Sequence, residues 1–284
     1  MNNPLPFGLI GLDFPSDSIY KAASDYHLKW VELFHGINIE EKQVEEVSSI
    51  LIKKNLQVAS ISSLVKLNQV EEDLNTQIEF VKKSIKIASE LNAPFSSFMY
   101  GGNYHLDRLS ARDRFMKRME PLIEDAIKKG VTLLIENVFS RNPPGDIDAA
   151  EITFELMEQL DTSYVGLLFD PANYAIGGEE AFPFAYKLLK KHIKYIHFKD
   201  AVKYVPSWHG QLGGRRELID FNRGTHISVP LGKGVVNYEG LLTELTIDSF
   251  NGPIALEPFS HGNQCELWLH ESLNYLKSHK FRIS

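Results

Sequence analysis

The sequence contains a single cysteine, Cys265, among its 284 residues. One cysteine cannot form an intrachain disulfide bond, and zinc sites built from several cysteines are excluded as well. No uninterrupted apolar run approaches the roughly 18 residues that a membrane-spanning helix needs. The first residues carry no basic stretch ahead of an apolar core, so we expect no secretory signal peptide. These absences predict a cytoplasmic protein that binds no membrane.

An excess of positive charge is also missing. The chain has 30 basic and 37 acidic residues, and its formal net charge is −7. Proteins that bind nucleic acid independently of its sequence usually present a basic face, so this balance argues against a nucleic-acid partner. Hydrophobic residues make up 43% of the chain, which is enough for a substantial buried core.

Short apolar runs alternate with longer amphipathic segments along the whole sequence. Near-continuous apolar runs are typical of parallel strands that are covered on both faces. The expected strands cover residues 7–14, 29–34, 57–62, 94–100, 131–137, 164–170, 194–200 and 252–258. Amphipathic helices are expected between them, among others at 40–55, 75–92, 110–130 and 263–279.

Eight strand–helix units of about 35 residues each fit into this length, and eight parallel strands close a barrel. An open, doubly wound sheet is the alternative. It would be favoured by a glycine-rich phosphate fingerprint after the first strand, and "GLIGLDFPSDS" contains none. We therefore predict an α/β protein with a single (β/α)8 TIM barrel domain over residues 1–284.

Two segments carry more specific expectations. In the helix at 110–130, Ser110 is placed as the N-cap, Gly130 lies just past the end, and Pro121 predicts a kink or a break. The connection at about 201–235 contains six glycines and has no helical pattern. Long irregular connections usually form a lid or a binding loop, so we expect an active-site loop there.

Four successive strands, the fifth to the eighth, end on ionisable side chains, which are Glu136, Asp170, His197 and Glu257. Each of them alone could be a solvated group or a salt-bridge partner. In a (β/α)8 barrel, however, the carboxyl ends of the strands converge around one axis and carry the active site. Three carboxylates and one imidazole suit a divalent ion such as Mn²⁺, Mg²⁺, Co²⁺ or Zn²⁺.

The motifs "LLIEN", "FDPANY", "HFKDA", "PLGKGVVNY" and "IALEPF" follow one another in an order and spacing that resembles the xylose-isomerase-like sugar phosphate isomerase/epimerase superfamily. The resemblance covers essentially the whole chain. It implies one divalent metal ion, with Mn²⁺ as the first candidate, held by Glu136, Asp170, His197 and Glu257. It also implies that the two glutamates are the catalytic acid and base on opposite faces of a small carbohydrate, which is isomerised or epimerised through a metal-stabilised cis-enediolate.

Other residues are candidates for substrate contacts. Asn173 stands where many epimerases of the family have a second histidine; it can donate a hydrogen bond to a substrate hydroxyl but cannot act as a base. Lys199 shares the inward direction of the histidine two residues earlier, and either a substrate oxygen or a carboxylate could be its partner. Glu32 could reach substrate or orient another group. Asp200 is expected to fix a ligand or the following loop.

His209 and Arg215 lie in the long connection and are further candidates for contacting substrate. An arginine there could bind a phosphate or carboxylate through two hydrogen bonds, although a solvated arginine is the plainer alternative.

Three other functions compete with isomerisation. A dehydratase or lyase acting on a cyclic polyol of the inosose type would begin with the same proton abstraction, and only turnover separates the two. A zinc endonuclease for abasic DNA sites would need additional histidines, which are absent from "ASISS" and from position 173. A non-catalytic binding protein is the third. Barrels of this kind often associate, so the protein could also form a homo-oligomer.

Overall fold

The computed structural model describes residues 5–14, 17–68, 74–101, 106–138, 149–160, 162–205, 217–220, 224–260 and 264–279. Every statement below about structure refers to these residues. None of the helices among them has the length and apolar character required to cross a membrane.

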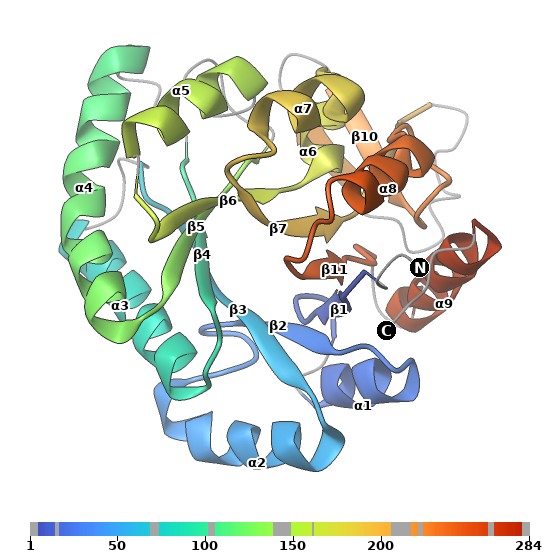
Figure 1. The fold of residues 1–284 in the computed structure, drawn as a ribbon, viewed down its shortest axis with the longest axis horizontal. Coiled ribbons are helices and arrows are strands. Elements are labelled where there is room, and N and C mark those ends of the chain that lie inside the picture. Colours follow the sequence, from blue (N-terminus) through green and yellow to red (C-terminus); the bar gives the residue numbers. More distant parts are fainter. Residues whose placement is uncertain are drawn as a thin grey trace.

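Eight parallel strands close into a barrel in the order β1-β11-β7-β6-β5-β4-β3-β2 (Figure 1). The first strand pairs with both β2 and β11, so this sheet has no free edge. This confirms the predicted (β/α)8 fold. The strands are β1 (Phe7–Ile10), β2 (Trp30–Phe34), β3 (Gln57–Lys66), β4 (Phe95–Met99), β5 (Thr132–Glu136), β6 (Val165–Phe169), β7 (Ile193–Phe198) and β11 (Ile254–Leu256).

Helices surround the barrel and cover the outer face of the sheet (Figure 1). The longer ones are α1 (Ser18–Asp25), α2 (Val44–Lys54), α3 (Leu74–Glu90), α4 (Arg108–Lys129), α5 (Ala150–Leu160), α8 (Tyr238–Ile247) and α9 (Gln264–Ser278). Short helical segments are η1 (Glu41–Gln43), α6 (Pro171–Ile176), η2 (Ala181–Ala185) and α7 (Tyr186–Leu189).

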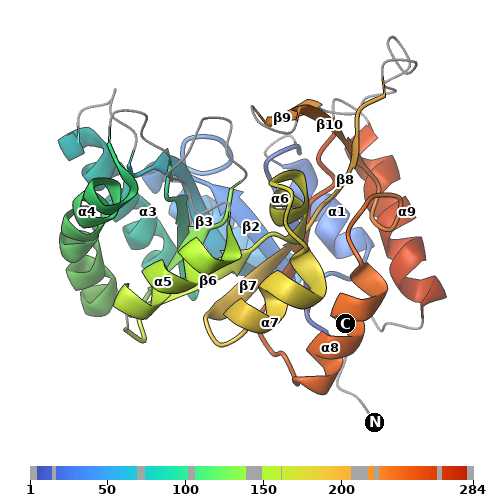
Figure 2. The same cartoon turned by 90° about the horizontal axis from the view of Figure 1, so that it is seen from above.

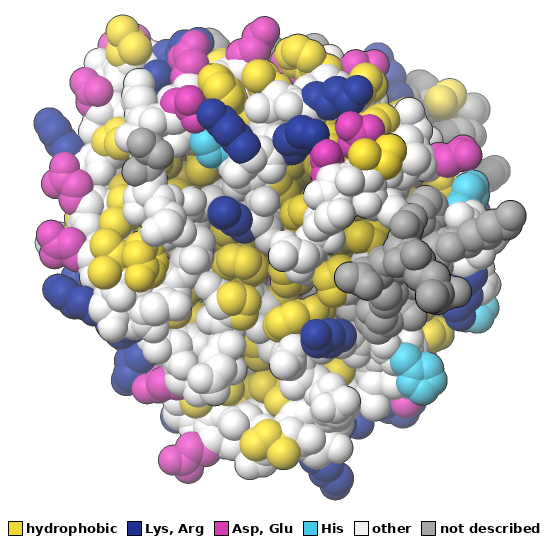
Figure 3. Space-filling view, in the orientation of Figure 1, with side chains coloured by type: hydrophobic (Ala, Val, Ile, Leu, Met, Phe, Trp, Pro, Cys, Tyr) yellow, Lys and Arg dark blue, Asp and Glu magenta, His cyan; other side chains and the backbone are white. Residues whose placement is uncertain are grey.

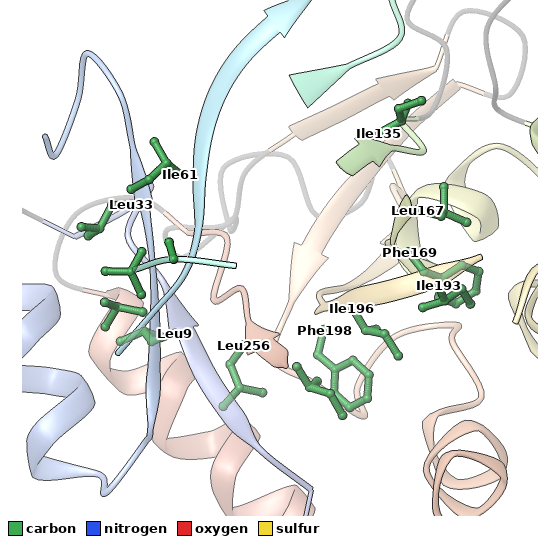
Figure 4. Close-up of a cluster of buried hydrophobic side chains, with 14 of the residues drawn as sticks. Leu9, Leu33, Ile61, Ile135, Leu167, Phe169, Ile193, Ile196, Phe198 and Leu256 are labelled. Carbon is green, nitrogen blue, oxygen red and sulfur yellow. The ribbon is translucent and has the colours of Figure 1, made fainter. Parts of the chain in front are cut away.

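Two apolar layers explain why the strands read as continuous hydrophobic runs. Side chains alternate between the two faces of a strand, and in this barrel both faces are covered. The layer between strands and helices includes Leu9, Leu33, Ile61, Phe169 and Phe198 (Figure 4). The inner layer contains Ile10, Phe34, Ala59, Leu134, Leu168, Tyr195 and Ala255.

Helix α4 begins earlier than its sequence predicts. The N-cap is Asp107 and not Ser110, because the Asp107 carboxylate accepts hydrogen bonds from the backbone N–H groups of Leu109 and Ser110, both at 3.0 Å. The helix also continues past Pro121, so of the two alternatives, a kink or a break, the break does not occur. Gly130 caps the end in a left-handed conformation, with φ +67°, as predicted.

The connection after β7 is not irregular throughout. It contains β8 (Asp200–Lys203), β9 (Glu217–Asp220) and β10 (Gly224–Val229), which form an antiparallel sheet in the order β8-β10-β9. Figure 2 shows this sheet beside α6 and α9, outside the ring of barrel strands. His209 and Arg215 lie outside the described residues, and their predicted substrate contacts stay predictions.

The side chain of Asp200 is hydrogen-bonded to the chain where it returns from the antiparallel sheet to the barrel. Its carboxylate accepts hydrogen bonds from the backbone N–H groups of Gly232 at 3.0 Å and Gly234 at 2.8 Å, and from Ala201 at 3.0 Å. A Cβ atom on Gly234 would lie 1.9 Å from Asp200 Oδ1, so the close approach requires glycine there. Of the two roles considered for Asp200, the contacts favour that of fixing the loop.

On the face shown in Figure 3, acidic side chains lie mainly toward the rim, and hydrophobic side chains are visible both toward the middle and near the edge.

Candidate metal centre

The four ionisable residues predicted at the strand ends occupy neighbouring strands of the barrel. Glu136 is the last residue of β5, Asp170 follows β6, His197 lies near the end of β7 and Glu257 follows β11. These strands are hydrogen-bonded in the order β5-β6-β7-β11, which brings the ends together. One ligand atom each from Glu136, Asp170 and His197 lies within 4.8 Å of the others.

Glu257 joins this cluster through the histidine. Its Oε2 atom lies 3.8 Å from His197 Nδ1, and Glu136 Oε1 lies 3.8 Å from the same nitrogen. The imidazole Nδ1 is thus the point toward which two carboxylates converge.

Glu32 determines which ring nitrogen faces the cluster. His197 Nε2 lies 2.7 Å from Glu32 Oε2, and the Tyr195 hydroxyl donates a hydrogen bond of 2.8 Å to the same carboxylate oxygen. The hydroxyl of Ser97 donates to the other oxygen at 3.5 Å. Glu32 is only 1% exposed, so this geometry favours an orienting role for it. A carboxylate behind a ligand histidine is the usual way to fix its tautomer and direction.

Several buried atoms of the cluster have no hydrogen-bond partner among the described residues. They are His197 Nδ1, Asn173 Oδ1, Asp170 Oδ2 and Glu257 Oε2, and of these the two carboxylate oxygens form ion pairs with Lys199. Buried polar atoms are normally paired, because leaving them unpaired costs free energy. A divalent ion that takes mixed nitrogen and oxygen ligands would satisfy the imidazole and the carboxylate, so the residues fit the metal ion that their sequence implies.

Burial and crowding of like charges alter the proton affinities of the cluster. Burial raises the pKa of Glu136 to about 7, and nearby Asp170 and Glu257 contribute to the increase. Burial likewise raises the pKa of Glu257 to about 7. For His197, burial acts to lower the pKa, but the carboxylates of Glu32, Glu136 and Glu257 together outweigh it and raise the pKa to about 9. The centre therefore favours added positive charge, whether protons or a metal ion.

Asn173 and Lys199 lie beside the cluster. The amide nitrogen of Asn173 donates to the carbonyl oxygen of Asn137 at 2.9 Å and to Glu136 Oε1 at 3.3 Å. Lys199 Nζ lies 2.6 Å from Asp170 Oδ2. Burial acts to lower the pKa of Lys199, but the carboxylates of Asp170, Glu257 and Glu136 together outweigh it, so the pKa is raised. The salt-bridge alternative for Lys199 is thus the contact present in this structure.

Sequence reasoning missed Tyr195 and Ser97. Tyr195 is fully buried in the inner layer of the barrel, and its position two residues before His197 places both on the same face of β7. Strand periodicity could therefore have found the tyrosine. Ser97 is two residues before the end of β4 and follows Ser96. Its partner Glu32 lies on β2, which is not adjacent to β4 in the sheet, so the sequence gives no indication of this contact.

A family model described as xylose isomerase-like TIM barrel matches residues 20–279. None of the curated proteins matches the chain at a significant level. Solved structures with the same fold are numerous. The IOLI protein with a bound zinc atom superposes with a TM-score of 0.76 at 14% identity, over 98% of this chain and 99% of that protein.

Two further similar structures are named as a dehydratase and a sugar epimerase. The probable 3-DHS dehydratase AsbF involved in petrobactin synthesis from Bacillus anthracis has a TM-score of 0.74 at 18% identity, over 96% of this chain and 99% of the other. The D-allulose 3-epimerase from Methylomonas sp. has a TM-score of 0.72 at 15% identity, over 97% and 98%. At these identities the likeness establishes the fold.

Proposed function

The chain belongs to the xylose isomerase-like TIM barrel family, and from this we propose that it is a divalent-metal-dependent isomerase or epimerase of a sugar or sugar derivative. The observation that carries the proposal is the cluster of Glu136, Asp170 and His197, whose ligand atoms lie within 4.8 Å of one another. The similarity to a D-allulose 3-epimerase supports a small carbohydrate as the substrate.

Glu136, Asp170, His197 and Glu257 would hold the metal ion. When bound, a divalent ion polarises a carbonyl group and makes the neighbouring C–H bond more acidic. Mn²⁺ is the first candidate, because carboxylate ligands suit it and one imidazole is compatible with it. Glu32 would keep His197 in the tautomer whose Nδ1 faces the ion, through the 2.7 Å contact with Nε2.

Glu136 and Glu257 would exchange the proton with the substrate. In the metal-free centre burial raises the pKa of both glutamates to about 7, and a bound cation would lower it again, so that a glutamate can act as the carboxylate that removes the proton. Return of the proton to the same carbon from the opposite face gives an epimer. Delivery to the adjacent carbon gives an isomer. Two carboxylates in one centre can carry out either epimerisation or isomerisation.

Asn173 and Lys199 are proposed to contact the substrate. Asn173 keeps a buried carbonyl oxygen, Oδ1, that lacks a partner among the described residues and could accept from a substrate hydroxyl. Lys199 could donate to a substrate oxygen if it leaves Asp170.

Metal content per chain tests the centre. We expect about one equivalent of Mn²⁺ in the wild-type protein, and loss of it in Glu257→Gln and His197→Ala. Glu271→Gln is the matched control, because this glutamate pairs with Lys233 on the surface. A wild-type protein that takes up no metal from excess Mn²⁺ would remove the basis of the proposal.

Proton exchange with solvent tests the reaction. Candidate ketoses incubated with the metal-loaded protein in D₂O should gain deuterium at the carbon next to the carbonyl, and Glu136→Gln and Glu257→Gln should abolish this exchange. Product analysis separates the alternatives, because a dehydratase acting on a cyclic polyol would release water and form a double bond. Binding of a carbohydrate without exchange or turnover would favour a non-catalytic protein.

A further inference from the structure

Lys199 places a positive charge inside the candidate metal centre. The residue is 6% exposed. Its Nζ atom lies 2.6 Å from Asp170 Oδ2 and 3.4 Å from Glu257 Oε2. The same ammonium lies 5.6 Å from the centre of the Phe259 ring. Two of the four predicted metal ligands thus surround a cation that the chain itself supplies.

The two oxygens of Asp170 have different partners. Oδ1 accepts hydrogen bonds from the backbone N–H groups of Ala172 at 2.8 Å and Asn173 at 3.1 Å, at the start of α6. Oδ2 contacts Lys199. Because the first oxygen is committed to the helix, the second is the atom best placed to bind a metal ion. The lysine and the ion would therefore share one oxygen.

Glu257 presents the same conflict. Its Oε2 atom faces His197 Nδ1 at 3.8 Å and Lys199 Nζ at 3.4 Å. A divalent ion bound between the imidazole and this oxygen would lie close to the ammonium. Two cations at such a distance in a buried site repel each other strongly, since little solvent screens them.

The total charge of the centre nevertheless accommodates both cations. The carboxylates of Glu136, Asp170 and Glu257 carry three negative charges, which match one divalent ion and one ammonium group, and Glu32 adds a fourth behind His197. Buried charges are stable only when they are balanced. Lys199 is therefore expected to shift within the centre when metal binds, and not to be expelled from it.

We propose that Lys199 is a resident cation that competes with the metal ion for Asp170. In metal-free protein it neutralises Asp170 and Glu257, and it withdraws from Asp170 Oδ2 when the ion binds. It acts as a positioning residue that lowers the affinity for metal while stabilising the metal-free barrel. This inference rests on the proposed function, because it takes the centre to bind a divalent metal.

The sign of one affinity change tests the inference. Lys199→Met removes both the competition for Oδ2 and the repulsion, so Mn²⁺ should bind more tightly, by roughly tenfold, which is within the usual range of coupling between neighbouring sites. Titration calorimetry on protein stripped with EDTA measures this change. Lys233→Met is the matched control, because that lysine is 61% exposed and pairs with Glu271, and its affinity should equal that of the wild type.

Weaker or unchanged Mn²⁺ binding by Lys199→Met would overturn the inference, because a lysine that merely organises the carboxylates would be needed for affinity. Melting of the stripped proteins gives a second readout, in which Lys199→Met should unfold at a lower temperature than the wild type.

A crystal structure of the wild-type protein with Mn²⁺ covers the case in which Lys199→Met does not fold. Lys199 Nζ should then lie beyond hydrogen-bonding distance of Asp170 Oδ2, roughly 3.2 Å. A contact that persists beside a bound ion refutes the inference alone and leaves the proposed function standing. A wild-type protein that binds no Mn²⁺ refutes both.

Discussion

At the scale of single residues, the centre depends on a side chain behind the four candidate ligands. Glu32 accepts from Tyr195 at 2.8 Å and contacts His197 Nε2 at 2.7 Å, and so sets the direction of the imidazole. The four ligand candidates could be predicted from the sequence because each ends a strand. The pairing of Glu32 with Tyr195 and His197 could not, since it joins strands that are distant in the chain.

Replacement of Glu32 by Gln should weaken metal binding by about 10- to 100-fold, the usual effect of removing a partner behind a ligand histidine. The amide keeps the shape but removes the charge that holds the His197 proton on Nε2. Mn²⁺ titration measures the change. Glu40→Gln is a matched control, because Glu40 Oε2 lies 3.6 Å from the Nε2 atom of His35 outside the centre. Equal affinities in the two variants would refute the orienting role.

At the scale of elements, sequence patterns located the helices and strands well but not all of their ends. Asp107 and Ser110 are both good N-cap residues, and composition alone cannot choose between two candidates three positions apart. Strands β8 and β9 have four residues each, and they lack the apolar runs that marked the barrel strands. Short strands outside a core give a weak periodic signal.

Asp107→Ala should destabilise the protein by about 1 kcal/mol, because two backbone N–H groups at the start of α4 lose their acceptor. Ser110→Ala should change the free energy of unfolding by less than about 0.5 kcal/mol, since Ser110 only donates a surface hydrogen bond to Asp107. Urea denaturation compares the two variants. A larger loss of stability in Ser110→Ala than in Asp107→Ala would indicate that Ser110, and not Asp107, is the N-cap.

Gly234→Ala should destabilise the protein by roughly 1–3 kcal/mol, the range for overpacking a tight contact. The new Cβ atom would meet the Asp200 carboxylate, which must then give up its bonds to the returning chain. Chemical denaturation measures the loss. Gly130→Asn should be nearly neutral, because nothing lies within 4 Å of a Cβ there and Asn tolerates the left-handed conformation. An unchanged free energy of unfolding in Gly234→Ala would show that the Asp200 side chain can move away from the new Cβ atom without cost.

At the scale of the whole molecule, closure of the barrel was predictable because eight apolar runs of similar spacing leave few other arrangements. The same closure concentrates charge. Side chains from strands that are far apart in sequence meet on one axis, so the proton affinities of Glu136, Glu257 and His197 are properties of the folded barrel and not of any segment.

The stability of the protein should respond to pH with opposite signs in the presence and absence of metal. Folding raises the pKa of Glu136 and Glu257 from 4.5 to about 7 and that of His197 from 6.5 to about 9. Groups with a raised pKa stabilise the fold when protonated, so metal-free protein should lose stability as the pH rises from about 5 to 9. Metal needs the unprotonated ligands, so Mn²⁺ should bind more tightly over the same range.

Thermal melting with EDTA or Mn²⁺ at several pH values measures both slopes. Glu257→Gln should flatten the slope in EDTA, because one titrating group is gone, whereas Glu271→Gln should leave it unchanged. A melting temperature in EDTA that rises with pH contradicts this account of the buried charges.

The antiparallel sheet after β7 leaves the barrel and returns to it at almost the same point. Asp200 begins the excursion, and the chain that comes back through Gly232 and Gly234 is hydrogen-bonded to that same side chain. One side chain thus holds both points at which this segment is attached to the barrel. A change in length between these two points therefore need not displace the strand ends that carry the ionisable residues.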